Sequence, residues 1–356
     1  MREDGLETVL PLFNMEEKMK IMLLVFVMAM MLVAGLSAIG SAIYWTSPVM
    51  TETDVAMIAK HDLAIIDIEN LFNNPDNLRE IKQINPQCRV LAYVNFFEIW
   101  QSPIPPNRPF GSKLNQTITS QFSDWLLVRD DSQLASFWPG MQPLNLSDLC
   151  PVIHGYTYTR YMQEILLENI LNDRVWGGLF LDNLFDRVSW LGNLDLNRDG
   201  QVDDSRTVDY HWYRGVSRFL TGIRQAKGSN FQIWGNHLSL FWKDTVNGRF
   251  LEDFPTQDWC WEEAMAIAGQ LPEVVFQGKG QGMDLAFNSS LLLDNAFFCL
   301  GQNMAVPDSM LVKLSSLKKL PASQRGALIF NAADHTYQRQ LGEELIQVRL
   351  NRQTSD

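Results

Sequence analysis

The sequence has few of the residue types that most often bind metals or cross-link a chain. Its 356 residues include four cysteines and five histidines. No cysteine lies in a CxxC pair, the histidines show no HExxH spacing, and no GxSxG segment occurs. These absences speak against a zinc site, a thioredoxin-type redox site and a serine hydrolase. Outside the cytoplasm the cysteines allow disulfides, but they can equally be buried free thiols.

Basic residues are also in the minority. The chain has 29 Lys and Arg residues against 41 Asp and Glu residues, which gives a formal net charge of -12. Nucleic acids and anionic membrane surfaces attract proteins with the opposite balance, so neither is expected as a partner. A neutral or cationic ligand fits the acidic charge. The 11 Trp and 20 Phe residues supply rings on which sugars can stack, although most such rings fill protein cores.

Charged residues are absent from Ile21 to Ile43, a long apolar run. At about 1.5 Å per residue, a helix of this length spans a bilayer. Lys18 and Lys20 precede the run, and the next basic residue is Lys60. The positive-inside rule therefore places the N-terminus in the cytoplasm and the rest of the chain outside.

Two interpretations of residues 21–43 stay open, a transmembrane anchor and a signal peptide, and both follow a cytoplasmic segment at 1–20. The small residues Gly40–Ala42 fit a signal cleavage site. Without cleavage, the helix is predicted to hold the protein on the membrane; with cleavage, the protein is predicted to be secreted. Both interpretations predict export.

After a linker at 44–60, short apolar runs alternate with polar stretches of helical spacing. Such runs are typical of strands that are buried on both faces. The runs are residues 63–69, 89–95, 125–128, 178–182, 231–236, 249–254, 273–277 and 295–300. Eight strands that alternate with helices predict an α/β fold, a (β/α)8 or TIM barrel over residues 61–305.

A doubly wound open sheet is the competing fold. No GxGxxG segment follows the first strand, which disfavours the dinucleotide-binding form of that fold. Residues 306–356 are predicted to form a small C-terminal extension that contains a strand at 326–331.

Acidic side chains stand where two of the predicted strands end. Asp182 ends the run GLFLD, and Glu252 lies within FLEDF. The carboxyl ends of barrel strands meet at one face, and glycoside hydrolysis needs two carboxyl groups that flank one bond. We therefore predict Asp182 as nucleophile or base and Glu252 as general acid. The structural alternatives are a helix cap at Asp182 and an ion pair between Glu252 and a nearby arginine such as Arg249.

Further side chains at the strand ends are predicted to bind substrate. They are Asp67, Glu69, Tyr93, Asn95, Asp130, Asn183, Asn236 and His237. Asp67 and Glu69 are also the runner-up catalytic pair, because alternation along a strand lets both point the same way. His237 is predicted to orient a carboxylate or bind a hydroxyl, although an isolated histidine is more often structural.

The sharpest local motif is DLNRDGQVDD, which begins at Asp195 and matches the first part of an EF-hand-type calcium loop. The predicted calcium ligands are Asp195, Asn197, Asp199, Gln201 and Asp203. The twelfth position is Arg206, which cannot bind calcium, so Asp204 or Asp209 has to replace the missing acid. A solvated acidic turn is the alternative. The calcium would be structural, and no cofactor is predicted for catalysis.

In their order, several stretches resemble the exported (β/α)8 proteins of the hypothetical glycosyl hydrolase 15 group and, more distantly, glycoside hydrolase family 114. They are AIIDIEN (64–70), VLAYVNFFEIW (90–100), DWLLVRDDSQLASFWPG (124–140), GLFLDNLFD (178–186) with DLNRDGQVDD after it, FLEDF (250–254) and GALIFN (326–331). The resemblance implies a barrel that acts on polysaccharides and supports Asp182 and Glu252 as its two carboxyl groups. Family 114 implies an α-linked galactosamine polymer, a cationic substrate that suits the acidic charge.

The sequence thus predicts a glycoside hydrolase that acts on an extracellular polysaccharide. A non-catalytic carbohydrate-binding or cell-surface scaffold on the same barrel is the alternative from another class. A metal-dependent deacetylase is disfavoured because no histidine-based metal set is present. A carboxyl separation of roughly 5–10 Å between Asp182 and Glu252, across an open cleft, would favour hydrolysis.

Overall fold

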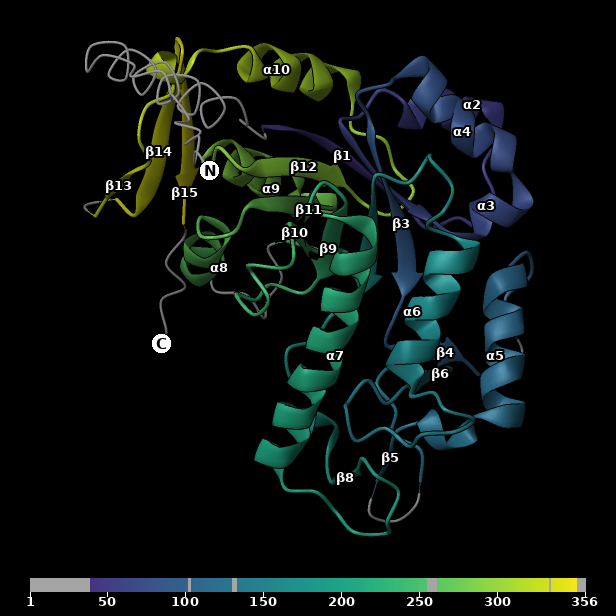
Figure 1. Ribbon diagram of the computed structural model, residues 1–356. Coiled ribbons are helices and arrows are strands. Elements are labelled where there is room, and N and C mark those ends of the chain that lie inside the picture. The colour runs from purple at the N-terminus through teal and green to yellow at the C-terminus, as the bar shows by residue number, and fades with distance from the viewer. Residues whose placement is uncertain (1–38, 102–103, 130–132, 255–260, 333, 351–356) are drawn as a thin grey trace, which may run out of the picture. The chain divides into compact units, whose positions relative to one another are not determined.

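A closed barrel of eight parallel strands forms the centre of the fold (Figure 1). The computed structural model describes residues 39–101, 104–129, 133–254, 261–332 and 334–350. In barrel order the strands are β1 (Gly40–Trp45), β2 (Leu63–Asp67), β3 (Arg89–Asn95), β7 (Gly178–Asp182), β9 (Gln232–Asn236), β10 (Gly248–Leu251), β11 (Glu273–Gly278) and β12 (Ala296–Leu300). β12 pairs with β1 and closes the ring. The predicted (β/α)8 barrel is confirmed.

Large side chains fill the inside of the barrel. The rings of Tyr44 and Phe250 lie 4.8 Å apart, and Phe180 lies 5.9 Å from Tyr44. Every residue of β1 and β2 is buried, because one face of each strand meets this interior and the other meets the helices. Burial on both faces explains why the strands appear in the sequence as continuous apolar runs.

A helix follows each barrel strand except β9. The helices of this outer layer are α2 (Glu52–Ile58), α4 (Pro75–Ile84), α6 (Tyr158–Asn169), α7 (Ser205–Lys227), α8 (Trp261–Ala268), α9 (Met283–Leu291) and α10 (Asp308–Lys318). The short helix α3 (Glu69–Asn73) precedes α4. Single 3-10 turns lie at η1 (Ser123–Trp125), η2 (Ser189–Leu191), η3 (Gly280–Gly282) and η4 (Ala322–Gln324).

Residues 237–247, all described, form turns where a helix would be expected after β9. Arg249 of β10 is fully buried beneath them and donates a hydrogen bond to the carbonyl of Phe241. A Cβ atom at Gly235 of β9 would come within 2.5 Å of Leu184 Cδ2 and 2.8 Å of Arg249 Nη1. Glycine at 235 therefore makes room for the arginine that holds this loop beside the end of β9.

The long connection from β3 to β7 carries the other additions to the barrel. It contains β4 (Glu98–Trp100), α5 (Pro109–Gln121), β5 (Val128–Arg129) and β6 (Met141–Pro143). β4 pairs with β6, while β5 pairs with β8 (Leu194–Asp195). β4 contacts α5. In Figure 1, β5 and β8 lie near the first turns of α7. The barrel thus carries an extra layer at the end where β3 and β7 finish.

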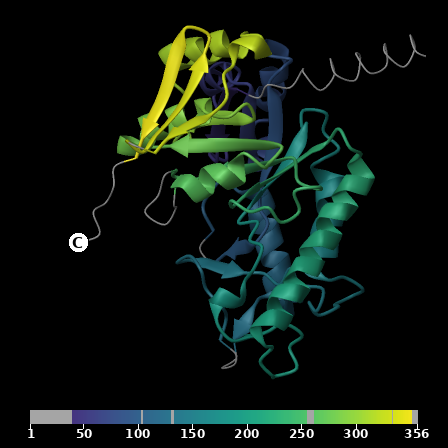
Figure 2. The ribbon, with the colours of Figure 1, turned by 90° about the vertical axis from the view of Figure 1, so that its left-hand side faces the viewer.

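Three antiparallel strands follow α10, namely β13 (Ile329–Asn331), β14 (Thr336–Leu341) and β15 (Glu344–Arg349). This sheet lies against α9 and α8, with the Trp261 and Tyr337 rings 4.5 Å apart, and away from α7 (Figure 2). The predicted strand at 326–331 corresponds to β13. α10 belongs to the outer helix layer and contacts β1, so the boundary expected at residue 306 separates the barrel from its own last helix.

One predicted strand is wrong and another was missed. Residues 125–128 are not in the barrel, because Trp125 lies in η1 and Val128 in β5. Trp125 stacks on Phe122 at 4.1 Å and donates to the carbonyl of Pro151, so the run is apolar because it is buried within the extra layer. The missed strand is β1. It contains the last residues of the predicted apolar segment (21–43) and the first residues of the predicted linker (44–60).

β1 also changes the expected boundaries. Gly40–Ala42, the predicted cleavage site, are buried residues of a barrel strand, and the predicted linker contains the end of β1 and helix α2. The remainder of the predicted membrane segment, 21–38, lies outside the described residues. Within the described part of the chain, no helix combines the length and the apolar character needed to cross a membrane. Cys88, Cys150 and Cys299 are buried free thiols, and Cys260 lies outside the described residues.

Candidate active site

A cleft of about 390 Å³ opens where the barrel strands end. Its lining comes from β1, β3, β4, β7 and the segment after β10, so residues far apart in sequence meet there. The lining residues are Tyr44, Thr46, Tyr93, Asn95, Glu98, Trp100, Arg108, Trp138, Pro139, Met141, Asp182, Asn183, Glu252 and Gln302. Both predicted catalytic acids and three of the predicted substrate-binding residues, Tyr93, Asn95 and Asn183, are among them.

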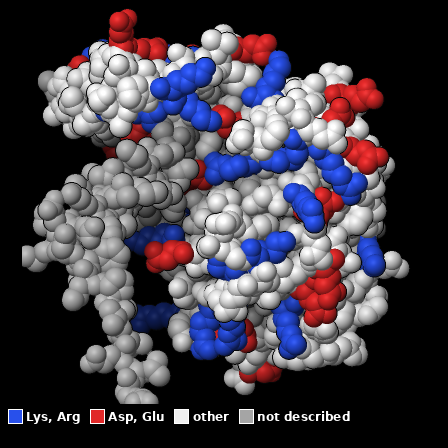
Figure 3. Space-filling model, turned by 45° about the horizontal axis from the view of Figure 1, so that its top comes forward, with Lys and Arg blue, Asp and Glu red and all other residues white. Residues whose placement is uncertain are grey.

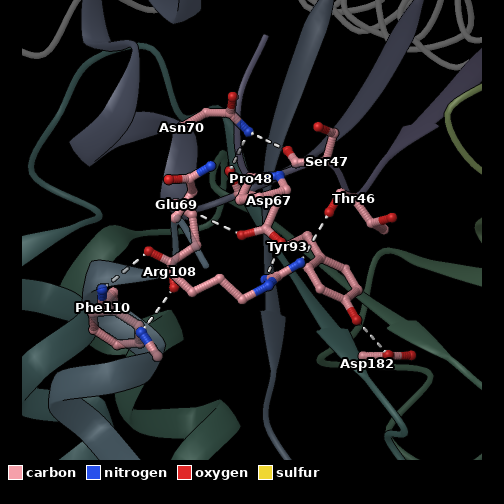
Figure 4. A network of polar contacts seen from close by, with 12 residues as sticks. Thr46, Ser47, Pro48, Asp67, Glu69, Asn70, Tyr93, Arg108, Phe110 and Asp182 are labelled. Carbon is pink, nitrogen blue, oxygen red and sulfur yellow. Dashed lines mark hydrogen bonds and ion pairs between the residues drawn. The ribbon is translucent and has the colours of Figure 1, made fainter. Parts of the chain in front are cut away.

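Asp182 lies at the bottom of this cleft, at the last position of β7. Tyr93 Oη donates to Asp182 Oδ2 at 2.6 Å (Figure 4), and Asn236 Nδ2 donates to Oδ1 at 2.9 Å. The backbone N–H of Asn183 also donates to Oδ1, at 3.0 Å. Burial raises the pKa of Asp182 above its usual value, and these three donors oppose that shift by favouring the ionised form. Asp182 is therefore a fixed carboxylate rather than a helix cap.

Glu252 directly follows β10 and lines the cleft. β9 lies between β10 and β7, the strand that carries Asp182. The nitrogen of Asn236 that donates to Asp182 also donates to Glu252 Oε2, at 2.8 Å. Since the same nitrogen is 2.9 Å from Asp182 Oδ1, the two carboxylate oxygens lie at most about 5.7 Å apart. Glu252 is exposed to solvent, yet partial desolvation of its carboxyl group by the surrounding protein, and next the negative charge of Asp182, raise its pKa to about 7. The structural alternative, an ion pair between Glu252 and Arg249, is not formed, because that arginine lies beneath the loop after β9.

Asp67 and Glu69, the runner-up pair, both have partners within the protein (Figure 4). Asp67 Oδ2 lies 2.7 Å from Arg108 Nη1, and its Oδ1 accepts from the backbone N–H of Glu69 at 2.9 Å. The oxygens of Glu69 accept from the backbone N–H groups of Phe110 and Gly111, at the start of α5. Neither residue lines the cleft, but both line a smaller adjoining pocket that shares Tyr93, Asn95, Glu98, Trp100 and Arg108 with it. The pair holds α5 and Arg108 against the barrel.

Glu98 is a third carboxylate of the cleft, which the sequence interpretation did not select. It lies on β4, and only 3% of its surface is exposed. Its backbone N–H donates to Asn95 Oδ1 at 3.1 Å. Burial, and next the charge of Asp182, raise the pKa of Glu98 to about 7. Glu98 comes three residues after the end of β3. No catalytic sequence motif includes it, so no signal in the sequence would select it.

Aromatic side chains form the walls of the cleft, as the sequence suggested only in general terms. Trp100 of β4 and Trp138 of the connection line it, and 54% of Trp138 is exposed. Tyr44 of β1 forms part of the floor and contacts the hydroxyl of Tyr93. The alternation of apolar residues could not reveal Tyr44, because its strand was assigned to the membrane segment and the linker.

The remaining predicted binding residues are placed differently. Asn236 reaches the cleft acids through its amide, although it forms no part of the lining. His237 is turned toward Asp186, with Nε2 3.6 Å from Oδ1, and does not line the cleft. Its left-handed backbone, at φ 119, points it into the loop that follows β9. Asp130 lies outside the described residues.

The predicted calcium loop folds onto its own backbone. Asp195 accepts from the N–H groups of Asp199 and Gly200, and Asp203 Oδ2 accepts from the N–H of Leu196. Over the described ranges, no group of three or more His, Cys, Asp or Glu side chains is arranged to hold a metal ion. Calcium binding by this loop therefore stays a prediction from the sequence.

The cleft differs in charge from the outer surface. On the face drawn in Figure 3, basic and acidic side chains are interspersed over the described residues. The cleft is lined by three carboxylates, Glu98, Asp182 and Glu252, and by one basic side chain, Arg108, which is paired with Asp67. In the lining of the cleft, acidic side chains therefore outnumber basic ones by three to one.

A barrel with carboxylates at the carboxyl ends of its strands and aromatic walls is the architecture of many glycoside hydrolases. Residues 82–323 match the model of the family described as "Hypothetical glycosyl hydrolase family 15". This match covers more than half of the chain, and the protein belongs to that family. The resemblance to the hypothetical glycosyl hydrolase 15 group is confirmed.

A solved structure of a maltogenic alpha-amylase shares the fold. A noncanonic maltogenic alpha-amylase, AmyB, from Thermotoga neapolitana superimposes with a TM-score of 0.51 and 8% identity, over 87% of this chain and 85% of that chain. The cycloalternan-degrading enzyme from Trueperella pyogenes gives a TM-score of 0.48 at 12% identity, over 87% of this chain and 60% of that chain. This chain thus spans 60% of the length of the Trueperella enzyme. No curated protein matches the sequence.

Proposed function

We propose that this protein is a glycoside hydrolase that acts on a polysaccharide with retention of configuration. Asp182 is the nucleophile, and Glu252 is the general acid and base. The observation that carries the proposal is the single amide nitrogen of Asn236, which donates to both carboxylates. The two oxygens that this nitrogen binds lie at most about 5.7 Å apart. This bound allows the ~5–5.5 Å carboxyl separation of retaining enzymes and is shorter than the ~6.5–9.5 Å separation of inverting ones.

The two steps of the proposed reaction follow from this geometry. In the first step, an oxygen of Asp182 bonds to the anomeric carbon while Glu252 gives its proton to the glycosidic oxygen, which leaves with its sugar. In the second step, Glu252 takes a proton from water, and the water oxygen displaces Asp182. The ester removes the charge of Asp182 between the steps, which lowers the pKa of Glu252 and changes it from acid to base.

The proton belongs to Glu252 rather than to Asp182 in the resting enzyme. Asp182 accepts three hydrogen bonds, whereas Glu252 accepts one, from Asn236. The charge of Asp182 further disfavours ionisation of Glu252. Two neighbouring carboxyl groups with unequal environments divide into one acid and one anion.

The pH dependence of hydrolysis follows from the pKa of Glu252, which is about 7. The first step needs Glu252 protonated, so kcat/KM is expected to be high below that pH and to fall as the pH rises through it. On the acidic side, kcat/KM falls where Asp182 takes up a proton. Initial rates from pH 4 to 9 measure both limbs. A value of kcat/KM that still increases between pH 7 and 9 would show that Glu252 is not the acid.

Removing the hydroxyl of Tyr93 is expected to impair Asp182 without unfolding the barrel. Tyr93→Phe removes the donor to Asp182 Oδ2, and a hydrogen bond to a charged group contributes about tenfold to 100-fold in kcat/KM. Because Tyr93 lowers the pKa of Asp182, the acidic limb should shift to higher pH. Tyr44→Phe, one hydroxyl further from the carboxylate, serves as the comparison and should have the smaller effect. Equal effects of both variants would argue for general loosening of the barrel floor.

The substrate is tested with the full chain and three tetrasaccharides: maltotetraose, cellotetraose and a tetramer of α-linked galactosamine. Release of reducing ends shows hydrolysis, and the anomer first formed, read by NMR, shows retention or inversion. A first product of inverted configuration would contradict the proposed nucleophile. Binding without turnover would favour the non-catalytic carbohydrate-binding scaffold.

We further propose that the barrel acts outside the cytoplasm, either tethered to a membrane or secreted. The apolar residues 21–38, which precede β1, and the lysines before them support this proposal. Protease treatment of intact cells tests it, because an exported barrel is digested from outside and a cytoplasmic one is protected.

A further inference from the structure

Of the carboxylates that line the cleft, Glu98 is the one that the proposed reaction does not use. Its Oε1 atom is buried and has no hydrogen-bond partner within the described part of the chain. The carboxyl group does interact with the side chain of Asn95, which favours its ionised form. Buried polar atoms in native proteins are nearly always satisfied, so such an atom in a cleft indicates a place for water or a ligand. Arg108, the basic side chain of the lining, does not satisfy it, because Arg108 contacts Asp67 and the carbonyl of Thr46 (Figure 4).

The position of Glu98 is fixed by its backbone. Its N–H is bound by Asn95, and β4 pairs with β6 on the other side, where Glu98 lies opposite Pro143. Glu98 and Trp100 are two residues apart on the same strand, so their side chains project from the same face of β4. Both line the cleft. A carboxylate and an indole on one face can hold a sugar, with the ring stacked on Trp100 and its hydroxyls turned to Glu98.

The barrel order sets Glu98 and Glu252 on opposite sides of Asp182. Asp182 ends β7, which lies between β3 and β9. Glu98 comes from the β3 side, whereas Glu252 follows β10, beyond β9. A sugar held above Asp182 with its glycosidic oxygen toward Glu252 therefore presents its other edge to β4.

We propose that Glu98 binds the sugar unit that Asp182 attacks, by accepting hydrogen bonds from its hydroxyl groups on the side opposite Glu252. This inference rests on the proposed function and assigns Glu98 to substrate recognition rather than to proton transfer. Hydroxyl donors favour the ionised carboxylate, so binding of the sugar should release protons near pH 7, where free Glu98 is partly protonated.

The test compares Glu98→Gln and Glu98→Ala in the full chain, with Glu168→Gln as the matched control. Glu168 is an exposed glutamate of α6 outside the cleft. With whichever of the three tetrasaccharides is hydrolysed, Glu98→Ala should raise KM about tenfold or more, with kcat changed less than about threefold. Glu98→Gln keeps one neutral acceptor and should give a smaller rise. Calorimetry at pH 7 in phosphate and in Tris should show proton release on binding to the wild type that Glu98→Gln loses.

Two outcomes would overturn the proposal. An unchanged KM in both variants would make Glu98 part of the wall only, and a 100-fold loss of kcat at unchanged KM would make it a proton donor. If the wild type binds a tetrasaccharide without cleaving it, the proposed reaction fails, and Glu98 is judged by the same tenfold rise in the dissociation constant. If none of the three is bound or cleaved, both proposals fail. Thermal melting of each variant separates these results from unfolding.

Discussion

Asp182→Asn is expected to reduce kcat/KM at least about 1,000-fold, because the variant lacks the nucleophile on which the first step depends. Asn has the same shape as Asp, and the change removes a charge whose burial is unfavourable. The thermal midpoint is therefore expected to stay the same or to rise. Initial rates with the hydrolysed tetrasaccharide, together with a melting curve of each protein, measure both quantities.

A second pair of variants shows which acid does what. Glu252→Gln should lower kcat/KM by about 10²–10⁴-fold and remove the fall above pH 7. Asp253→Asn is the matched control, because Asp253 is the next residue, is paired with Lys279, and lies outside the cleft lining.

Azide added to Asp182→Ala should restore turnover and yield a glycosyl azide, since a small anion can occupy the vacated space and attack the anomeric carbon. The configuration of the azide separates the two roles, because it is inverted when azide replaces the nucleophile and retained when azide attacks the covalent intermediate of a variant that lacks the acid and base. An inverted azide from Glu252→Ala would therefore reverse the two roles.

The acids at the strand ends could be predicted because the carboxyl ends of all barrel strands meet at one face. A residue at the end of a strand therefore lies near the residues that end the neighbouring strands. Asp182 and Asn95 each end a run, and the strands β3 and β7 that carry them are neighbours with Asn95 opposite Asp182. Asn236 ends a third run, and its amide connects the two acids. The role of Asp67 could not be predicted in this way. Its ion pair with Arg108 depends on how the long connection after β3 returns to the barrel.

The two errors in the predicted strands have the same physical origin. An apolar run indicates that a segment is buried, but it does not show which part of the molecule covers it. Trp125–Val128 is as apolar as a barrel strand, but it is buried among Phe122, Tyr161 and the neighbouring loops of the extra layer. β1 shows the converse error. It directly continues an uncharged run. A membrane helix and a strand buried on both faces both consist of continuous apolar residues, so the sequence alone does not distinguish them.

Placing a charge in β1 is expected to unfold the barrel. Ala42 is completely buried, faces the barrel interior, and lies on a strand that pairs with both β2 and β12. Ala42→Glu brings a carboxylate into this interior without a partner, at a loss of at least about 4 kcal/mol in the free energy of unfolding, a large part of the ~5–15 kcal/mol of an ordinary domain. Urea denaturation followed by tryptophan fluorescence measures the loss. Val49→Glu, at an exposed position just after the strand, is the control and should change the midpoint little.

The same strand limits where the chain can be cut. A cut within Gly40–Ala42 would divide β1, leave β2 and β12 without their shared neighbour, and open the ring. It would also weaken the attachment of Tyr44, whose hydroxyl supports Tyr93 beneath Asp182. Any mature form that keeps the barrel closed should therefore begin at or before Gly40, as N-terminal sequencing of the protein from its own cells can show. A folded, active form that begins at residue 43 or later would mean that seven strands suffice, and that β1 contributes neither to closure nor to the site.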